Sequence, residues 1–357
     1  CPKMKLPSSG ELTKFSGKSR IPVLLCGPML ARLGRAIIPM PGGCQIGERP
    51  LNFHLLALQK LGATVKEGRD GYYLTAERLK GTKINLDYPS VGATEQVLLS
   101  SVLAEGPTEL TNAAIEPEVI DLVTLLQKMG AIIAVATDRV IRVTGVEKLN
   151  GFNHLAMPDR LEAASWASAA VATNGRILVR GARQPDLVTF LNKLRQVGGG
   201  FEISEDGITF FRASPLRSIS LETDVHPGFV TDWQPPFVVL LTQAQGNSVV
   251  HETVYENRFG YVEALNKMGA NIQLSEECLG KTKCRYRQRH YLHSALIKGP
   301  TPLTGAEITV PDLRAGFSYV IAACVANGRT KINNYSSLHR GYENLTEKLV
   351  SLGPNLE

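Results

Sequence analysis

The sequence contains no apolar run long enough to span a bilayer, and its first residues lack the basic and apolar regions of a secretory signal. It also has no dense basic stripe. Lys and Arg number 39 against 33 Asp and Glu, which gives a net charge of +6 over 357 residues. These absences disfavour a membrane protein and a nucleic-acid-binding protein, whereas a mildly basic surface suits anionic small molecules.

Cysteines are few and scattered. The six stand at positions 1, 26, 44, 278, 284 and 324, and no two form a CxxC pair. This spacing argues against a structural zinc site and against a disulfide framework, and it is typical of a protein from a reducing cytoplasm. Cys278 and Cys284 could touch across a hairpin, but we expect both to remain reduced thiols.

Several catalytic motifs are absent as well. There is no P-loop, no GxGxxG after a strand, no HExxH and no GxSxG. Their absence weighs against a nucleotide hydrolase, a nicotinamide-dependent enzyme, a zinc peptidase and a serine hydrolase. With 357 residues, 43% of them hydrophobic, the chain exceeds the usual size of one hydrophobic core, so we expect two domains.

What the sequence does contain is an internal repeat of about 70 residues. Each copy has an apolar first helix, a turn, a strand and an amphipathic second helix. The second helix ends at a glycine, which adopts the left-handed conformation that stops a helix. Five copies predict an α/β fold built by duplication. The second helices end at Gly62, Gly130, Gly198, Gly269 and Gly353, and the first helices are expected over residues 20–33, 92–104, 161–172, 237–244 and 313–326.

Unusual polar residues recur at the helix starts of these repeats. Serine or aspartate there is most simply an N-cap, as for Ser90 or Asp312. Arginine cannot have that role, because a cation opposes the dipole at a helix N-terminus. We therefore expect these arginines to have carboxylate or phosphate partners, from the chain or from a ligand. They are Arg49, Arg160, Arg258, Arg314 and Arg340.

One glycine-rich loop, at residues 41–50, carries Cys44 next to the charged pair Glu48 and Arg49. A thiol on an open loop beside a guanidinium is in a setting that favours the reactive thiolate. A small buried core residue is the alternative role for Cys44.

Together these motifs resemble the enolpyruvyl transferase family, and within it the UDP-N-acetylglucosamine 1-carboxyvinyltransferases. The resemblance implies a two-domain inside-out α/β barrel of the enolpyruvyl transferase type, with helices inside and sheets outside. It places the domains at residues 1–156 and 157–357. The matching motifs lie at residues 41–50, 89–95, 112–118, 158–160, 227–232, 256–259, 312–315 and 340–343.

The resemblance also implies an activity: transfer of the enolpyruvyl group of phosphoenolpyruvate to the 3-hydroxyl of UDP-N-acetylglucosamine, with release of phosphate, in peptidoglycan synthesis. No metal or redox cofactor is implied, and we expect a cytoplasmic monomer. Cys44 would donate a proton to the enolpyruvyl methylene and Asp232 would act as base. Arg20, Arg49 and Arg340 would clamp phosphoenolpyruvate; Ser90 and Gly92 would contact the diphosphate, Val254 the sugar, and Asp312 would support the closed state.

The sequence departs from this family in three ways. Relatives begin about one repeat earlier, so we expect the chain to lack an N-terminal unit and the Lys-Asn pair that this unit carries. Asn52 and His339 stand where the family commonly has aspartate. Another acceptor, such as a nucleoside or shikimate 3-phosphate, and a non-catalytic binding paralogue are the alternative functions. The basic segment 278–290 is expected to be a solvated hairpin, with a phosphate or nucleic-acid patch as the alternative.

Overall fold

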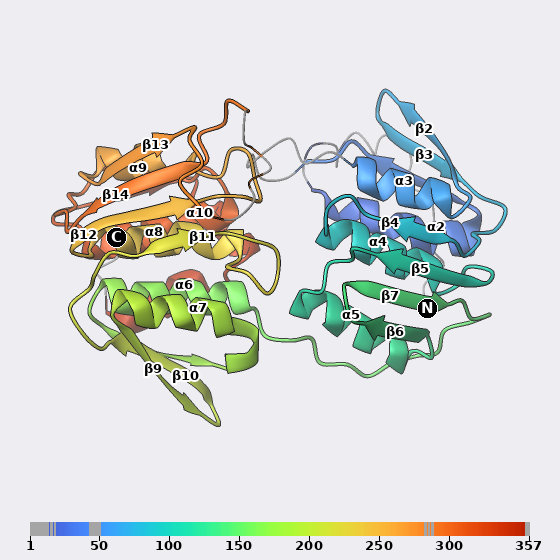
Figure 1. Ribbon diagram of the computed structural model, residues 1–357, viewed down its shortest axis with the longest axis horizontal. Helices are drawn as coiled ribbons and strands as arrows, with labels where there is room; N and C mark the ends of the chain where they lie inside the picture. Colours follow the sequence, from blue (N-terminus) through green and yellow to red (C-terminus); the bar gives the residue numbers. More distant parts are fainter. Residues whose placement is uncertain are drawn as a thin grey trace. The chain divides into compact units, whose positions relative to one another are not determined.

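A computed structural model of the chain describes residues 14, 17, 19–42, 51–281, 284, 286 and 289–353. The chain divides into two compact units, with the boundary between Met157 and Pro158 (Figure 1). Each unit has its own hydrophobic core. Within the described residues, none of the helices is long and apolar enough to cross a membrane.

The first unit contains two repeats of helices and strands. The strands form one sheet in the order β1-β3-β2 and another in the order β4-β5-β7-β6. The helices are η1 (Ile21–Leu25), α2 (Cys26–Leu33), α3 (Asn52–Lys60), α4 (Val91–Ser101) and α5 (Pro117–Lys128). The strands are β1 (Arg35–Pro39), β2 (Thr64–Gly68), β3 (Gly71–Thr75), β4 (Lys83–Asn85), β5 (Pro107–Thr111), β6 (Ile132–Ala136) and β7 (Val140–Thr144).

The second unit contains three repeats. Its sheets have the orders β8-β10-β9, β11-β12-β14-β13 and β15-β16. The helices are α6 (Arg160–Ala172), α7 (Gln184–Val197), η2 (Thr231–Trp233), α8 (Gln234–Thr242), α9 (Val262–Lys267), α10 (Leu313–Val325), η3 (Tyr335–Arg340) and α11 (Leu345–Leu352). The strands are β8 (Arg176–Arg180), β9 (Gly199–Ser204), β10 (Gly207–Arg212), β11 (Ser220–Glu222), β12 (Gly246–His251), β13 (Asn271–Ser275), β14 (Ser294–Gly299), β15 (Glu307–Thr309) and β16 (Lys331–Asn333).

Two pairing patterns recur among the repeats. A short strand pairs in parallel with the strand that follows the first helix, as β4 does with β5 and β11 with β12. The last two strands of a repeat form an antiparallel pair, such as β13 with β14. All five glycines at the ends of the second helices have positive φ angles, between 94° and 111°, which confirms the left-handed helix stops.

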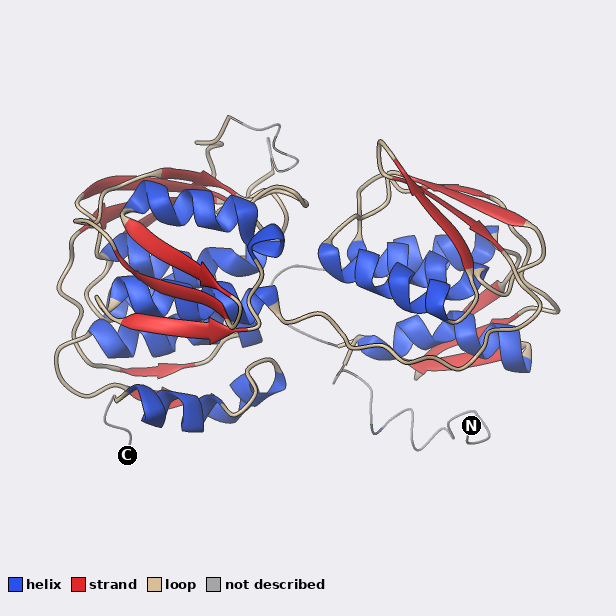
Figure 2. Ribbon diagram, turned by 90° about the horizontal axis from the view of Figure 1, so that it is seen from below, coloured by secondary structure: helices blue, strands red, loops and turns tan. Residues whose placement is uncertain are grey.

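The first helices of the three repeats, α6, α8 and α10, pack against one another inside the second unit, and the sheets lie outside them (Figure 2). Every residue of α8 is buried, and α8 packs against both α6 and α10. The alanines of α6 allow this close approach, while aromatic pairs such as Trp166 and Phe317, with ring centroids 4.9 Å apart, fill the remaining space. The strands form separate sheets rather than a closed barrel in the part of the chain described. The inside-out α/β prediction is therefore confirmed, without barrel closure.

Candidate functional site

The N-terminal ends of η2–α8 and α10 carry two of the predicted site residues of the second unit, and the start of α6 lies with them. Asp159 and Asp312 are the N-caps of α6 and α10, and each accepts hydrogen bonds from two backbone N–H groups of its helix. Asp232 lies in η2, directly before α8. The capping role expected for Asp312 is thus present, and an ion pair with Arg258 adds a second role.

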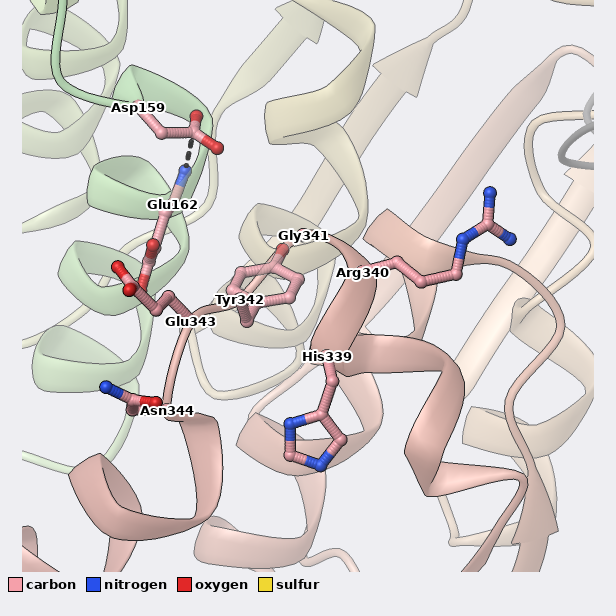
Figure 3. A pocket seen from close by; sticks show the side chains of 8 residues that line it. All are labelled: Asp159, Glu162, His339, Arg340, Gly341, Tyr342, Glu343 and Asn344. Carbon is pink, nitrogen blue, oxygen red and sulfur yellow. Dashed lines mark hydrogen bonds between the residues drawn. The ribbon is translucent and has the colours of Figure 1, made fainter. Parts of the chain in front are cut away.

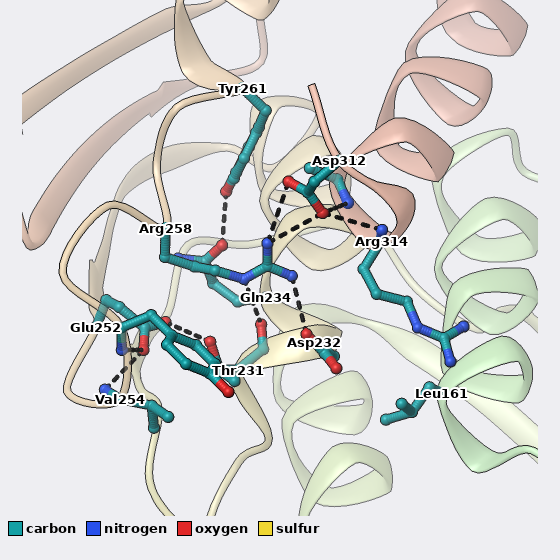
Figure 4. A network of polar contacts seen from close by, with 12 residues as sticks. Leu161, Thr231, Asp232, Gln234, Glu252, Val254, Arg258, Tyr261, Asp312 and Arg314 are labelled. Carbon is teal, nitrogen blue, oxygen red and sulfur yellow. Dashed lines mark hydrogen bonds and ion pairs between the residues drawn. The ribbon is translucent and has the colours of Figure 1, made fainter. Parts of the chain in front are cut away.

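Arg258 lies between Asp232 and Asp312 (Figure 4). Its side chain is fully buried and donates from Nη2 to Asp232 Oδ1 over 3.0 Å and from Nη1 to Asp312 Oδ1 over 3.4 Å. Burial alone would lower the pKa of Arg258, but the carboxylates of Asp312 and Asp232 raise it above its ordinary value. The guanidinium therefore stays charged and fixes the two aspartates relative to each other. The partner predicted for Arg258 comes from the chain itself.

Glu252 extends this network toward Val254. Its carboxylate accepts hydrogen bonds from the Thr231 hydroxyl over 3.0 Å and from the backbone N–H of Val254 over 2.7 Å. Burial raises the pKa of Glu252 above its usual value even though these bonds and Arg258 favour the charged form. Because Thr231 directly precedes Asp232, Glu252 connects Val254, which is predicted to contact the sugar, to Asp232, the predicted base.

Arg314 connects α10 to α6 and to the loop before α11. It donates from Nη2 to Asp159 Oδ2 over 3.1 Å and from Nη1 to the Gly341 carbonyl over 3.3 Å. Its guanidinium also lies 5.4 Å from the centre of the Tyr342 ring. Arg160, in contrast, lies 5.2 Å from the centre of the Trp233 ring, so an aromatic face is one of its contacts.

A pocket of about 460 Å³ lies next to these contacts, and Arg340 is one of the residues that line it (Figure 3). The side chain of Arg340 points away from Glu343 and Asn344, and its exposure makes it available to an anion. The pocket is lined by Asp159, Glu162, His339, Arg340, Gly341, Tyr342, Glu343 and Asn344.

The first unit holds Arg20, Ser90 and Gly92. Ser90 is the N-cap of α4 and accepts a hydrogen bond from the Ala93 N–H over 3.4 Å. A Cβ at Gly92 would lie only 2.9 Å from Cε1 of His54, so glycine lets this helix start approach α3 closely. Arg20 is the residue before η1, and η1 packs against α4.

Glu95, on α4, lies near two further carboxylates, Glu116 and Glu118. Burial, followed by the charges of Glu118 and Glu116, raises the pKa of Glu95 to about 7. Cys44 and Arg49 lie outside the described residues.

The chain is similar over most of its length to one family of proteins. The model of the EPSP synthase (3-phosphoshikimate 1-carboxyvinyltransferase) family matches residues 9–349. The chain belongs to this family of enolpyruvyl transferases.

Individual relatives agree with this assignment. The chain is 52% identical to a UDP-N-acetylglucosamine 1-carboxyvinyltransferase of Protochlamydia amoebophila over 96% of its own length and 75% of that protein. It is 50% identical to the protein of the same name from Chlamydia pneumoniae, again over 96% of the chain and over 76% of that relative. Among solved structures, the enolpyruvyl transferase NikO from Streptomyces tendae superposes with a TM-score of 0.83 at 25% identity, covering 99% of this chain and 79% of NikO.

Within this enolpyruvyl transferase, the structure brings Asp232 and Asp312 together through Arg258, and connects Val254 to them through Glu252 and Thr231. Sequence reasoning did not identify Glu252, His54 or Glu95 as site residues. Glu252 stands in a mixed segment, with His251 and Thr253 on either side, so it carried no local signal. The contacts of His54 and Glu95 depend on how α3, α4 and α5 pack, which no local pattern specifies.

Proposed function

We propose that this chain transfers the enolpyruvyl group of phosphoenolpyruvate to the 3-hydroxyl of UDP-N-acetylglucosamine and releases phosphate, the first committed step of peptidoglycan synthesis. The observation that carries the substrate pair is the 52% identity to a curated relative of that name. The arginine-bound aspartates at the helix starts of the second unit support the reaction type. We further propose a cytoplasmic monomer.

In this reaction, the sugar oxygen bonds to C2 of the enolpyruvyl group while its proton passes to Asp232. One oxygen of Asp232 is bound by Arg258, and the side chain remains 29% exposed, so the carboxylate is oriented and accessible. Cys44 donates a proton to the methylene carbon, which gives a tetrahedral ketal bearing phosphate and carboxylate. Loss of phosphate and of a proton from the new methyl group then forms the enol ether.

The anionic groups of this ketal need cationic and N–H partners. Arg340, in the pocket, is suited to the phosphate or carboxylate, and we assign Arg20 and Arg49 to the same anion. The start of α4, with Ser90 and Gly92, offers backbone N–H groups to the diphosphate. We assign Val254 to the sugar. Asp312, held by Arg258, is assigned to support of the closed state.

Release of phosphate from phosphoenolpyruvate tests the proposal. The chain is incubated with UDP-N-acetylglucosamine, a nucleoside, shikimate 3-phosphate or no acceptor. We expect release that depends on UDP-N-acetylglucosamine. If phosphate is released only with one of the other acceptors, that acceptor is the substrate in place of UDP-N-acetylglucosamine. Absence of release from folded protein with every acceptor would support the non-catalytic alternative.

The role of Asp232 is tested by Asp232→Asn, which keeps an oxygen to accept from Arg258 but removes the base. We expect kcat to fall about 10²–10⁴-fold, the usual contribution of a general base. The matched control is Glu202→Gln, a carboxylate on β9 that pairs with Arg176 at the surface. Equal kcat in both variants would contradict the assignment of Asp232 as base.

A further inference from the structure

Four side chains that the proposed reaction does not use meet at one end of the strands of the sheet β11-β12-β14-β13. His251 ends β12, Cys278 follows β13, and His293 directly precedes β14 (Figure 1). Cys284 lies in the segment between β13 and β14. One ligand atom from each of the four lies within 4.8 Å of the others. Both cysteines are thiols rather than a disulfide.

The hydrogen bonds of His251 fix its tautomer. The Ser294 hydroxyl donates to the Glu277 carbonyl over 2.6 Å, so its oxygen accepts from His251 Nδ1 over 2.8 Å. The proton of the neutral imidazole is therefore on Nδ1, and Nε2 carries a lone pair. In the described part of the chain, this buried Nε2 has no hydrogen-bond partner. Leaving such a buried nitrogen without a partner is costly.

His293 has the same arrangement. Its Nδ1 lies 2.6 Å from the Tyr291 carbonyl, which can only accept, so Nδ1 carries the proton. Its Nε2 lone pair faces Sγ of Cys278 at 3.3 Å. A bond from Nδ1 to a backbone carbonyl or hydroxyl is the usual outer contact that orients a metal-binding histidine. His293 thus presents Nε2 to the Cys278 thiol, and His251, in the same cluster, has a lone pair on Nε2 that no hydrogen bond occupies within the described residues.

The surroundings hold this geometry in place. Both histidines are fully buried. Tyr286 is also buried, and its ring centre lies 5.9 Å from that of His293, so the segment is not the wholly solvated hairpin that its charges predicted. A Cβ at Gly280 would lie 2.4 Å from the His251 ring, so a glycine is needed where the backbone crosses the imidazole.

We propose that His251, Cys278, Cys284 and His293 bind one Zn²⁺ ion in a structural site. Two thiolates and two neutral imidazoles are a ligand set that zinc prefers, whereas magnesium and calcium prefer oxygen. Bonds of about 2.3 Å to sulfur and about 2.0–2.1 Å to nitrogen place tetrahedral ligands about 3.3–3.8 Å apart. The distance of 3.3 Å from Cys278 Sγ to His293 Nε2 already lies in this range. The other ligand atoms, all within 4.8 Å of one another, need to move only slightly closer together.

Four protein ligands leave no open position for water or substrate, so the ion would be structural rather than catalytic. It would fasten the segment between β13 and β14 to the end of β12. The absence of a CxxC pair argued against zinc, but that argument considered only local spacing. The pairing of β12 with β14, which aligns His251 with Ser294, places His293 beside His251.

The test is the metal content of the protein purified under reducing conditions without chelators. We expect about one zinc per chain by mass spectrometry. Removal of zinc and titration with Co²⁺ should give thiolate-to-cobalt charge-transfer bands and the strong visible bands of tetrahedral cobalt. Cys284→Ser should lose the charge-transfer intensity of one thiolate and bind the metal at least tenfold more weakly. The matched control, Cys324→Ser, changes a thiol outside the cluster and should bind like the wild type.

Two results would overturn the proposal. One is that reduced wild-type protein contains little zinc and gives no tetrahedral cobalt spectrum. This result does not depend on whether any variant folds. The other is Cys284→Ser with metal affinity equal to that of Cys324→Ser. Neither readout depends on transferase activity, so the site can fail while the proposed function stands, and the reverse also holds.

Discussion

Arg258 provides the sharpest test of how the second unit is held together. Arg258→Gln removes a fully buried cation from between Asp232 and Asp312 and leaves the buried Glu252 without its nearest positive charge. Removal of one partner from a buried ion pair costs about 3–5 kcal/mol, because the remaining charges are desolvated and uncompensated. For a unit of this size, that loss corresponds to a fall in Tm of about 6–20 °C.

The matched control is Arg176→Gln. Arg176 pairs with Glu202 on a sheet, but both side chains are more than half exposed, so we expect a loss of at most about 1 kcal/mol. The assay is urea unfolding followed by tryptophan fluorescence. The chain has only two tryptophans, Trp166 and Trp233, and both lie in the second unit, so the signal reports on that unit alone.

The pH dependence of the free energy of unfolding distinguishes two causes of the loss: a buried carboxylate left without a counter-charge, and lost side-chain packing. In Arg258→Gln, the folded-state pKa of Glu252, which burial already raises and Arg258 lowers, should rise further above its unfolded value. Folding then favours the protonated form, so the variant should recover stability relative to wild type as the pH falls toward the ordinary carboxylate range. Losses of equal size for Arg258→Gln and Arg176→Gln, or a loss independent of pH, would refute this reasoning.

Three further outcomes are expected. Cys44→Ala should abolish acceptor-dependent phosphate release and leave the unfolding midpoint unchanged; a lower midpoint would indicate a core role. Gly130→Ala, at φ 95°, should destabilise the first unit by about 1–2 kcal/mol, measured by hydrogen exchange in α5, whereas Gly151→Ala, in open space, should have little effect. The pKa of Glu95 is raised from 4.5 to about 7, so its contribution stabilises the first unit below pH 4.5 and is lost as pH rises through 7. Glu95→Gln should remove that pH dependence, and a persistent pH dependence of exchange in α4 would contradict this.

Much of the fold could be predicted from the sequence because its signals are local. A glycine after the last helical turn stops a helix whatever lies around it, and the five stops at Gly62, Gly130, Gly198, Gly269 and Gly353 all have positive φ angles. The N-caps Ser90, Asp159 and Asp312 bond to N–H groups two or three residues away. Repetition of these signals indicated the duplicated α/β units.

The site could be predicted only in part. Local reasoning showed that Arg258 and Arg314 needed partners, but not which ones. Arg258 is 54 residues from Asp312, and Arg314 is 155 residues from Asp159. These pairs exist because buried helices from different repeats begin at the same place in the second unit.

The sequence by itself determined the repeats, the helix boundaries and the residue types at the helix starts, since each depends on contacts between near neighbours in the chain. Tertiary structure alone decided which charges meet and which are buried. It also aligned β12 with β14, so that His251 and His293 lie beside each other and close to Cys278 and Cys284. Burial and strand pairing depend on segments far apart in the sequence, and the free energy of an ion pair or a metal site depends on both.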